Sequence, residues 1–324
     1  MRVAVVGAGA TGGFLGGFLA RAGHEVTLIA RGAHLEAMRR HGLRVRTAEG
    51  ELTVRPDCTD DLGAVADAEV AFLAVKAHAV PPLAPALGAA LGPGTALVTL
   101  QNGIPWWYFQ RHGGPLDGTR LESVDPGGVI AEHVDVAHVV GAVVYPATRI
   151  VEPGVVEHVE GTRFSIGEPD GARSERCQAI SAALSKAGLK CPVRTDLRKE
   201  IWLKLIGNAT FNPLSALTRA SMVAIATDPA MRQVALALMR EAESVASAVG
   251  VRLDLTVEQR LDGAARVGEH KTSMLQDVEA RRPLEVDALV GAVVEIGHLS
   301  GLELPRLEML HACVKLLDAT LGRG

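Results

Sequence analysis

A glycine-rich turn near the start of the sequence constrains the fold more than any other feature. The short apolar run Arg2–Val6 leads into Gly7-x-Gly9-x-x-Gly12, and a helical pattern follows up to Ala22. In such strand–turn–helix units the first glycine allows a tight turn, the second lets the backbone approach a pyrophosphate, and the third lets the helix pack closely on the strand. The helix N-terminus then faces the negative charge. A glycine-rich turn without a ligand fits this placement less well, so we predict a dinucleotide site at Gly7, Ala8, Gly9, Ala10, Thr11 and Gly12.

Strands and helices alternate through the first half of the chain. The strand-like segments are Glu25–Ala30, Leu43–Thr47, Glu51–Val54, Glu69–Val75 and Thr95–Leu100, and a helix is predicted at Val80–Leu91. Two of these strands flank Gly50 and resemble a hairpin. The alternation of the others with helices predicts a parallel sheet that is covered on both faces.

The pattern changes after Gly141. Antiparallel-looking strands are expected at Ala142–Ala147, Val155–Val159 and Arg163–Ile166, then a helix at Ala172–Ala187 and a strand at Leu189–Val193. Beyond Thr195 only helices are predicted: Leu197–Leu217, Pro229–Val249, Val257–Arg266, Ser273–Ala280, Leu284–Leu299 and Pro305–Leu321. We therefore predict an α/β N-terminal Rossmann-type dinucleotide-binding domain, residues 1–195, followed by an all-α C-terminal domain, residues 196–324. The active site is expected in the cleft between them.

The end of the second predicted strand bears on the choice of cofactor. A site for NAD has Asp or Glu there, because a carboxylate accepts a hydrogen bond from the ribose 2′-hydroxyl. This chain has Ala30-Arg31 instead, with no acid to repel a 2′-phosphate and a guanidinium to pair with it. The pattern favours NADPH, and a solvated loop arginine is the competing interpretation of Arg31.

Two further polar residues follow predicted parallel strands. Lys76 stands at the end of Glu69–Val75, and Asn102 lies in Gln101-Asn102-Gly103 just after Thr95–Leu100. Open α/β sheets bind ligands at the carboxyl ends of their strands. We therefore predict that Lys76 and Asn102 bind the cofactor, with an ordinary loop lysine and a bare turn as the alternatives.

A predicted helix between Glu200 and Pro213 is apolar almost all the way round. Three polar side chains interrupt it, Lys204, Asn208 and Asn212, and their spacing of four residues places them in one narrow sector. A helix that is hydrophobic on every side is buried, and buried polar groups need partners. We expect this stripe to face a polar ligand in a cleft.

A carboxylate and a serine from later segments are the next candidates. On a helical wheel of Leu284–Leu299, Asp287, Glu295 and His298 fall in the solvated sector, whereas Glu285 lies within the apolar face. Glu285 could simply favour a helix N-terminus; its angular position suggests instead a carboxylate that needs a cation, and Lys204 is the candidate. Ser273-x-x-Gln276 reads as a capping box that opens a helix.

Composition excludes several classes of protein. The net charge is −4 and the pI is near 6.3, so no basic field is available for nucleic acid or an anionic membrane. The four cysteines and eleven histidines show no metal-ligand spacing, which fits a reduced cytoplasmic protein without a metal. The first apolar run stops at Gly7 and is expected to be a strand, not a signal peptide. No stretch is long enough to span a bilayer.

Taken together, the motifs resemble those of the ketopantoate reductase (2-dehydropantoate 2-reductase) family, within the 6-phosphogluconate-dehydrogenase-like superfamily. The matching segments run in family order over nearly the whole chain: Gly7-x-Gly9-x-x-Gly12, Arg31, Lys76, Gln101-Asn102-Gly103, Trp202-x-Lys204-Leu205-x-x-Asn208-x-x-x-Asn212-Pro213, Ser273-Met274-x-Gln276-Asp277 and Glu285-x-Asp287. The helix and Ser…Glu signature is far more specific than the glycine motif.

The resemblance implies a role for each matching residue. Lys204 would donate a proton to the substrate carbonyl, and Glu285 would hold the lysine and the cofactor or the product hydroxyl. Asn102 would touch both cofactor and substrate. The substrate would be bound by Asn208, Asn212 and Ser273, and the adenosine phosphate by Arg31 and Lys76. The implied activity is NADPH-dependent reduction of 2-dehydropantoate to pantoate, in pantothenate biosynthesis.

Two departures from the family pattern leave the substrate open. The family often has a further polar contact about ten residues after Asn212, where this chain has Ala220-Ser221-Met222. In addition, Trp106-Trp107-Tyr108-Phe109 concentrates four of the eleven aromatic residues. This aromatic run is either a hydrophobic plug or dimer contact, or a wall or lid over a bulkier 2-oxo acid. The alternatives to ketopantoate reduction are thus reduction of another 2-oxo acid and, less favoured, an NADPH-binding regulator without turnover. The expected partner is a small-molecule substrate, and a homodimer is left open.

Overall fold

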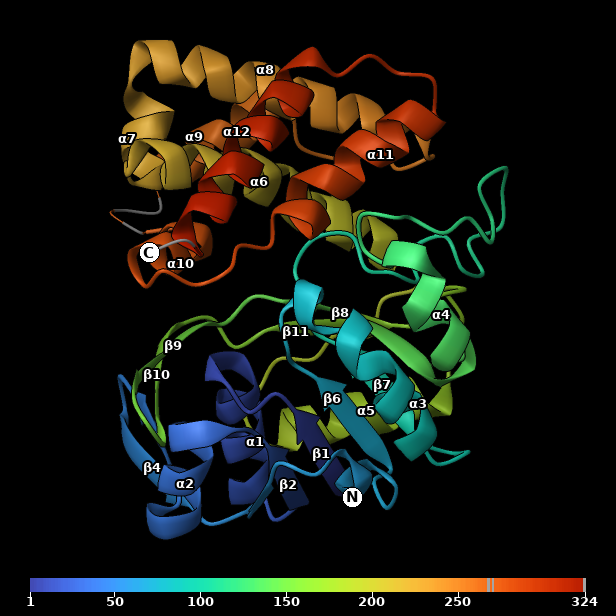
Figure 1. The fold of residues 1–324 in the computed structure, drawn as a ribbon, viewed down its shortest axis with the longest axis vertical. Coiled ribbons are helices and arrows are strands. Elements are labelled where there is room, and N and C mark those ends of the chain that lie inside the picture. Colours follow the sequence, from blue (N-terminus) through green and yellow to red (C-terminus); the bar gives the residue numbers. More distant parts are fainter. Residues whose placement is uncertain (267–268, 270, 323–324) are drawn as a thin grey trace. The chain divides into compact units, whose positions relative to one another are not determined.

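The computed structural model describes residues 1–266, 269 and 271–322 (Figure 1). Its elements up to residue 186 are β1 (Arg2–Val6), α1 (Ala10–Arg21), β2 (Glu25–Ile29), α2 (Gly32–His41), β3 (Leu43–Thr47), β4 (Gly50–Val54), β5 (Asp57–Thr59), β6 (Val70–Leu73), α3 (Ala84–Ala90), β7 (Ala96–Thr99), α4 (Val129–His133), β8 (Val139–Val144), β9 (Ala147–Glu152), β10 (Val155–Glu160), β11 (Phe164–Gly167) and α5 (Glu175–Lys186). Short 3₁₀ turns lie at Leu62–Val65, Ala77–Ala79, Pro81–Leu83, Pro126–Gly128 and Val136–His138.

The remaining described elements are helical. They are α6 (Leu197–Thr218), α7 (Met222–Thr227), α8 (Pro229–Ala248), α9 (Val257–Ala265), α10 (Ser273–Glu279), a π-helical turn at Asp287–Gly291, α11 (Ala292–Leu299) and α12 (Pro305–Leu321). An α/β part that is followed by helices confirms the predicted fold class.

The contacts divide the chain into two compact units. The sheet unit comprises residues 1–101, 106–120 and 127–197, and the helical unit comprises residues 102–105, 121–126 and 198–324. Two short loops that follow β7 in sequence therefore belong to the helical unit. The division into domains 1–195 and 196–324 stays a prediction.

The sheet unit contains two sheets. The larger has the strand order β11-β8-β7-β6-β1-β2-β5, and all of its pairs are parallel except β11 with β8. The smaller has the order β4-β3-β10-β9, and its β3–β4 pair is the predicted hairpin. The carboxyl ends of the parallel strands therefore share one edge of the larger sheet, which is where ligands bind in this architecture.

Helix α1 lies between the two sheets, and its glycines allow this. A Cβ atom added at Gly16 would lie 2.5 Å from Leu28 of β2, and one at Gly17 would lie 2.9 Å from Val45 of β3. One at Gly13 would approach Val156 of β10 to 3.0 Å. Both faces of α1 thus approach their strands more closely than a larger residue would permit.

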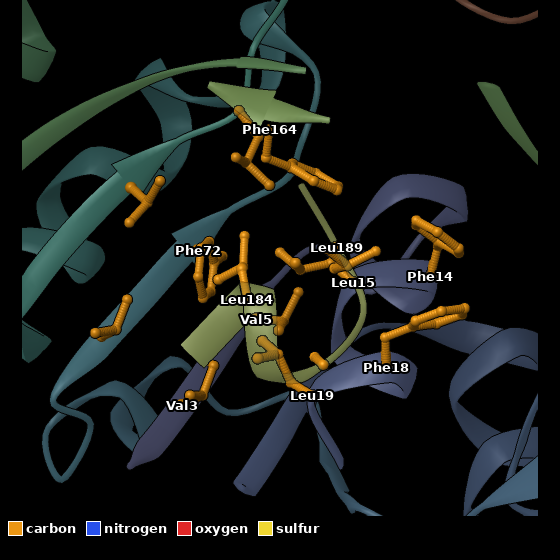
Figure 2. Close-up of a cluster of buried hydrophobic side chains, with 14 of the residues drawn as sticks. Val3, Val5, Phe14, Leu15, Phe18, Leu19, Phe72, Phe164, Leu184 and Leu189 are labelled. Atoms are coloured by element: carbon orange, nitrogen blue, oxygen red, sulfur yellow. The ribbon is translucent and has the colours of Figure 1, made fainter. Parts of the chain in front are cut away.

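The core of the sheet unit packs the larger sheet against α1 and α5. Figure 2 shows Val5 of β1, Phe72 of β6 and Phe164 of β11 converging with Leu15 of α1 and Leu184 of α5, and all five are buried. Removing apolar side chains such as these from water is the main favourable contribution to the folding free energy of the unit.

The predicted strand at Leu189–Val193 is wrong. The segment runs beside β11 and makes only isolated bridges, Arg163 with Lys190 and Ile166 with Val193. Pro192 has no N–H, so a continuous ladder cannot form there. Three helices were not predicted, α2, α4 and α7, and neither were the strands β5 and β9.

The buried helix predicted around Lys204 is confirmed as α6. Ile201, Trp202, Leu205, Ile206 and Ala209 are buried. The helix continues through Pro213 to Thr218. In the part of the chain described, no helix has both the length and the apolar character needed to traverse a bilayer.

Candidate functional site

A cleft of about 580 Å³ in the sheet unit lies at the carboxyl ends of β1 and β2. Its lining includes Gly7, Ala8, Gly9, Arg31, His34 and Asp60. The glycine-rich turn and Arg31, the second residue after β2, therefore share one cavity.

The glycine-rich turn has the geometry of a pyrophosphate cradle. Gly7 has φ +95°, and a Cβ there would lie 2.6 Å from Val75 Cγ1. A Cβ at Gly12 would lie 2.3 Å from the carbonyl oxygen of Gly7, whereas one at Gly9 meets no described atom within 4 Å. Gly9 is the N-cap of α1 and offers no capping side chain, so the first N–H groups of the helix suit an anionic ligand. These residues fit a dinucleotide.

Four other residues predicted to bind the cofactor are not among the described lining residues of the cleft but neighbour them in sequence. Ala10, Thr11 and Gly12 form the first turn of α1. Lys76 is half-buried and follows Val75, which lines the cleft; Lys76 itself is not among the described lining residues. The roles of all of them towards a cofactor stay predictions.

Sequence reasoning missed two polar residues of the cleft. His34 lies in the first turn of α2, and its Nδ1 accepts a hydrogen bond from the N–H of Gly154 at 3.0 Å. Burial lowers the pKa of His34, so the ring is neutral at physiological pH. Asp60 directly follows β5. The only available signal was its place after a strand, and that strand had not been predicted.

In the helical unit, Asn102 bridges Lys204 and Glu285. Lys204 Nζ donates to Asn102 Oδ1 at 2.7 Å, and Asn102 Nδ2 donates to Glu285 Oε2 at 3.4 Å. Because the ammonium can only donate and the carboxylate can only accept, these partners fix the orientation of the amide. Residues separated by 102 and 183 positions in sequence thus form one polar chain.

The surroundings of Lys204 change its acidity. Burial lowers the pKa of Lys204 to about 8, and the negative charge of Glu285 opposes this shift. An ammonium with such a pKa can release and regain a proton near neutral pH, which suits a general acid.

The two asparagines of the stripe continue along α6. Asn208 is half-buried and Asn212 is buried. Asn212 Nδ2 donates to Ser273 Oγ at 3.4 Å, so the stripe and the serine lie side by side. The capping-box interpretation of Ser273 is wrong: Thr272 is the N-cap of α10, and its side chain accepts from the N–H of Leu275.

A π-helical turn follows Glu285 and holds the loop that carries Asn102. The N–H of Ile104 donates to the carbonyl of Ala288 at 2.9 Å. Gly103 has φ +86°, and a Cβ there would lie 2.1 Å from the Ala288 oxygen. Only glycine permits this close approach, which sets Asn102 beside Glu285.

Two acids of the sector that was predicted to be solvated also make specific contacts. Asp287 accepts from His311 at 3.2 Å and from Lys315 at 2.8 Å, and these hydrogen bonds hold its pKa below the usual value. Glu295 accepts from the N–H groups of Glu122 at 2.7 Å and Ser123 at 2.8 Å. Both side chains are partly exposed, as the predicted solvated sector requires, and each also holds a neighbouring segment.

The aromatic run is buried in the sheet unit. Trp107, Tyr108 and Phe109 are at most 1% exposed, and Trp106 is 6% exposed. Trp107 Nε1 donates to Thr99 Oγ1 at 2.9 Å. This burial favours the hydrophobic plug over a wall or lid.

Comparison with known families gives two matches. Residues 3–106 match the model described as ketopantoate reductase PanE/ApbA, and residues 196–318 match its C-terminal counterpart. Together the two matches include the glycine-rich turn, Asn102, α6 and Glu285.

Individual relatives cover the full chain. A Mesorhizobium japonicum protein named 2-dehydropantoate 2-reductase is 47% identical over 99% of both chains. A solved structure of a provisionally named ketopantoate reductase from Ralstonia solanacearum is 41% identical, covers 99% of this chain and 98% of its own, and has a TM-score of 0.94. D-mandelate dehydrogenase, solved with NADH and anilino(oxo)acetate, has a TM-score of 0.84 at 20% identity, covers 99% of this chain and 100% of its own, and shares the fold.

Proposed function

Because this chain belongs to the ketopantoate reductase family and is an oxidoreductase, we propose that it reduces 2-dehydropantoate to pantoate with NADPH, as a step of pantothenate biosynthesis. The observation that carries the proposal is the chain of polar contacts Lys204–Asn102–Glu285. Its residues are those that the family resemblance assigns to the reaction.

Lys204 is the proton donor in this proposal. When bound, the dihydronicotinamide supplies the hydride that adds to the 2-oxo carbon. Negative charge then develops on the carbonyl oxygen, which the Lys204 ammonium stabilises and protonates. The product is the 2-hydroxy acid, and neutral Lys204 regains its proton from solvent. Asn102 holds the ammonium in place through its Oδ1 atom.

The remaining polar groups suit substrate and cofactor binding. Asn212 and Ser273 supply an amide and a hydroxyl for the substrate, with Asn208 one turn along α6. Arg31 supports the choice of NADPH, since its guanidinium suits a 2′-phosphate and it lines the cleft beside the glycine-rich turn. The four cysteines are unpaired thiols, which supports activity in the cytoplasm.

The direct test is a substrate comparison. We expect purified protein to oxidise NADPH with 2-dehydropantoate at a higher kcat/KM than with 2-oxo acids that carry aromatic or unbranched side chains. If 2-dehydropantoate ranks among the poorest of the panel, another 2-oxo acid is the substrate. Binding of NADPH without its consumption by any member of the panel would favour the regulator.

The acidity of Lys204 predicts how the rate depends on pH. A proton donor must be protonated, so we expect reduction to lose activity as pH rises through an apparent pKa of about 8. Glu285→Gln removes the negative charge that raises this pKa, and we therefore expect the basic limb to move to lower pH. Profiles of kcat from pH 6 to 10 for both proteins measure this. A limb that stays in place in the variant contradicts the coupling of Glu285 to Lys204.

A further inference from the structure

Strands β2 and β5 end side by side at the cofactor cleft. They are parallel neighbours with Ile29 opposite Thr59, and the N–H of Ala30 donates to the carbonyl of Thr59 at 2.9 Å. Asp60 follows Thr59, so its Cα lies about one strand spacing, roughly 5 Å, from the end of β2. The carboxylate that is missing from the end of β2 is thus present at the end of the neighbouring strand.

Asp60 and Arg31 line the same cleft with opposite charges. Asp60 Oδ1 lies 3.5 Å from Arg39 Nη2, but Arg39 is shared with Glu36 at 3.2 Å and also donates to the carbonyl of Cys58. The Asp60 side chain is 67% exposed, so its charge is open to the cleft and only partly compensated. His34, the other ionisable group described in the lining, is neutral at physiological pH and adds no positive charge.

We propose that Asp60 is a second determinant of dinucleotide choice that acts against Arg31. A carboxylate at this edge accepts a hydrogen bond from a ribose hydroxyl and repels a 2′-phosphate. Arg31 has the opposite preference. The chain therefore binds NADH as well as NADPH, with a narrow preference for NADPH. This inference rests on the proposed function, because it assumes that the cleft holds the dinucleotide of that reaction.

Dissociation constants measured without substrate test the proposal. Nucleotide fluorescence is titrated with the wild-type protein, Asp60→Asn and the control Asp57→Asn, which changes an acid of the same strand that lies outside the described lining of the cleft. For Asp60→Asn we expect the Kd of NADPH to fall roughly three- to ten-fold, with no gain for NADH, and the effect to shrink at high salt. Asp57→Asn should leave both constants unchanged.

Two outcomes separate this inference from the function on which it rests. If the wild-type protein binds both nucleotides and Asp60→Asn leaves the ratio of their Kd values unchanged, the role of Asp60 is refuted and the proposed function stands. If the wild-type protein binds neither nucleotide, the cofactor assignment itself fails. If Asp57→Asn changes the ratio of the two Kd values as much as Asp60→Asn does, a specific role of Asp60 is refuted. The effect would then come from the net charge of the protein and not from the position of the carboxylate.

Discussion

Replacing Lys204 with alanine is expected to lower turnover by two to four orders of magnitude while the Kd of NADPH stays near its wild-type value. A positioned general acid contributes a factor of this size, and alanine can neither stabilise nor protonate the developing alkoxide. We expect Asn102 to keep its other partner, Glu285, in the variant, because that hydrogen bond does not involve Lys204. Steady-state kinetics with 2-dehydropantoate and a fluorescence titration with NADPH measure the two quantities separately.

Lys199→Ala is the matched control, because Lys199 lies on the same helix and pairs instead with Asp254 at 2.9 Å. We expect that variant to keep turnover within a few-fold of wild type. Full turnover in Lys204→Ala would remove the proton-donor role. Equal losses of turnover and NADPH affinity would point to damage of the fold, not of the chemistry.

Alanine substitutions at two glycines of the same turn are expected to have separable effects. Gly12→Ala places a methyl group 2.3 Å from the Gly7 carbonyl oxygen, so the turn and α1 must shift apart. We expect a lower melting temperature, since overpacking costs about 1–3 kcal/mol of folding free energy. We also expect NADPH affinity to weaken by roughly 10- to 100-fold, because the shifted first turn of α1 no longer presents its N–H groups to the pyrophosphate. Gly9→Ala meets no described atom within 4 Å, so it should keep the melting temperature and weaken only the binding of the pyrophosphate.

Thermal unfolding and nucleotide titration of the two variants together test this contrast. Unchanged NADPH affinity in Gly9→Ala would mean that the pyrophosphate does not approach this turn. Unchanged stability in Gly12→Ala would contradict the close packing of α1 on β1.

The sequence predicted those elements whose pattern is set by local rules. The glycine-rich turn, the hairpin and the all-round apolar helix around Lys204 each follow from backbone geometry or from one period of hydrophobicity. Helix α2 was not predicted because it is strongly charged and buries only Leu35 and Met38, so it shows little hydrophobic periodicity. Helix α7 was not predicted because it is short. Its N-cap, Ser221, was considered only as a position for a substrate contact.

The site was predictable as a set of residues but not as a set of contacts. A direct pairing of Glu285 with Lys204 was expected, whereas Asn102 stands between them and bonds to both. That bridge depends on a carbonyl of the π-helical turn and on the left-handed backbone of Gly103, neither of which leaves a periodic trace in the sequence. Asp60 was missed for a related reason. It lies beside the end of β2 because β5 pairs with β2 in the sheet, and this pairing cannot be read from the order of the strands along the chain.

The position of α1 between two sheets has a consequence for nucleotide affinity. Strands on either side fix the direction of its axis. The close contacts at its glycines mean that a tilt of the helix would bring its backbone into collision with side chains of these strands. A cradle that is rigid before the ligand arrives loses little entropy on binding, so more of the interaction energy is retained as affinity. The apo and nucleotide-bound forms should therefore superpose closely over the first turn of this helix.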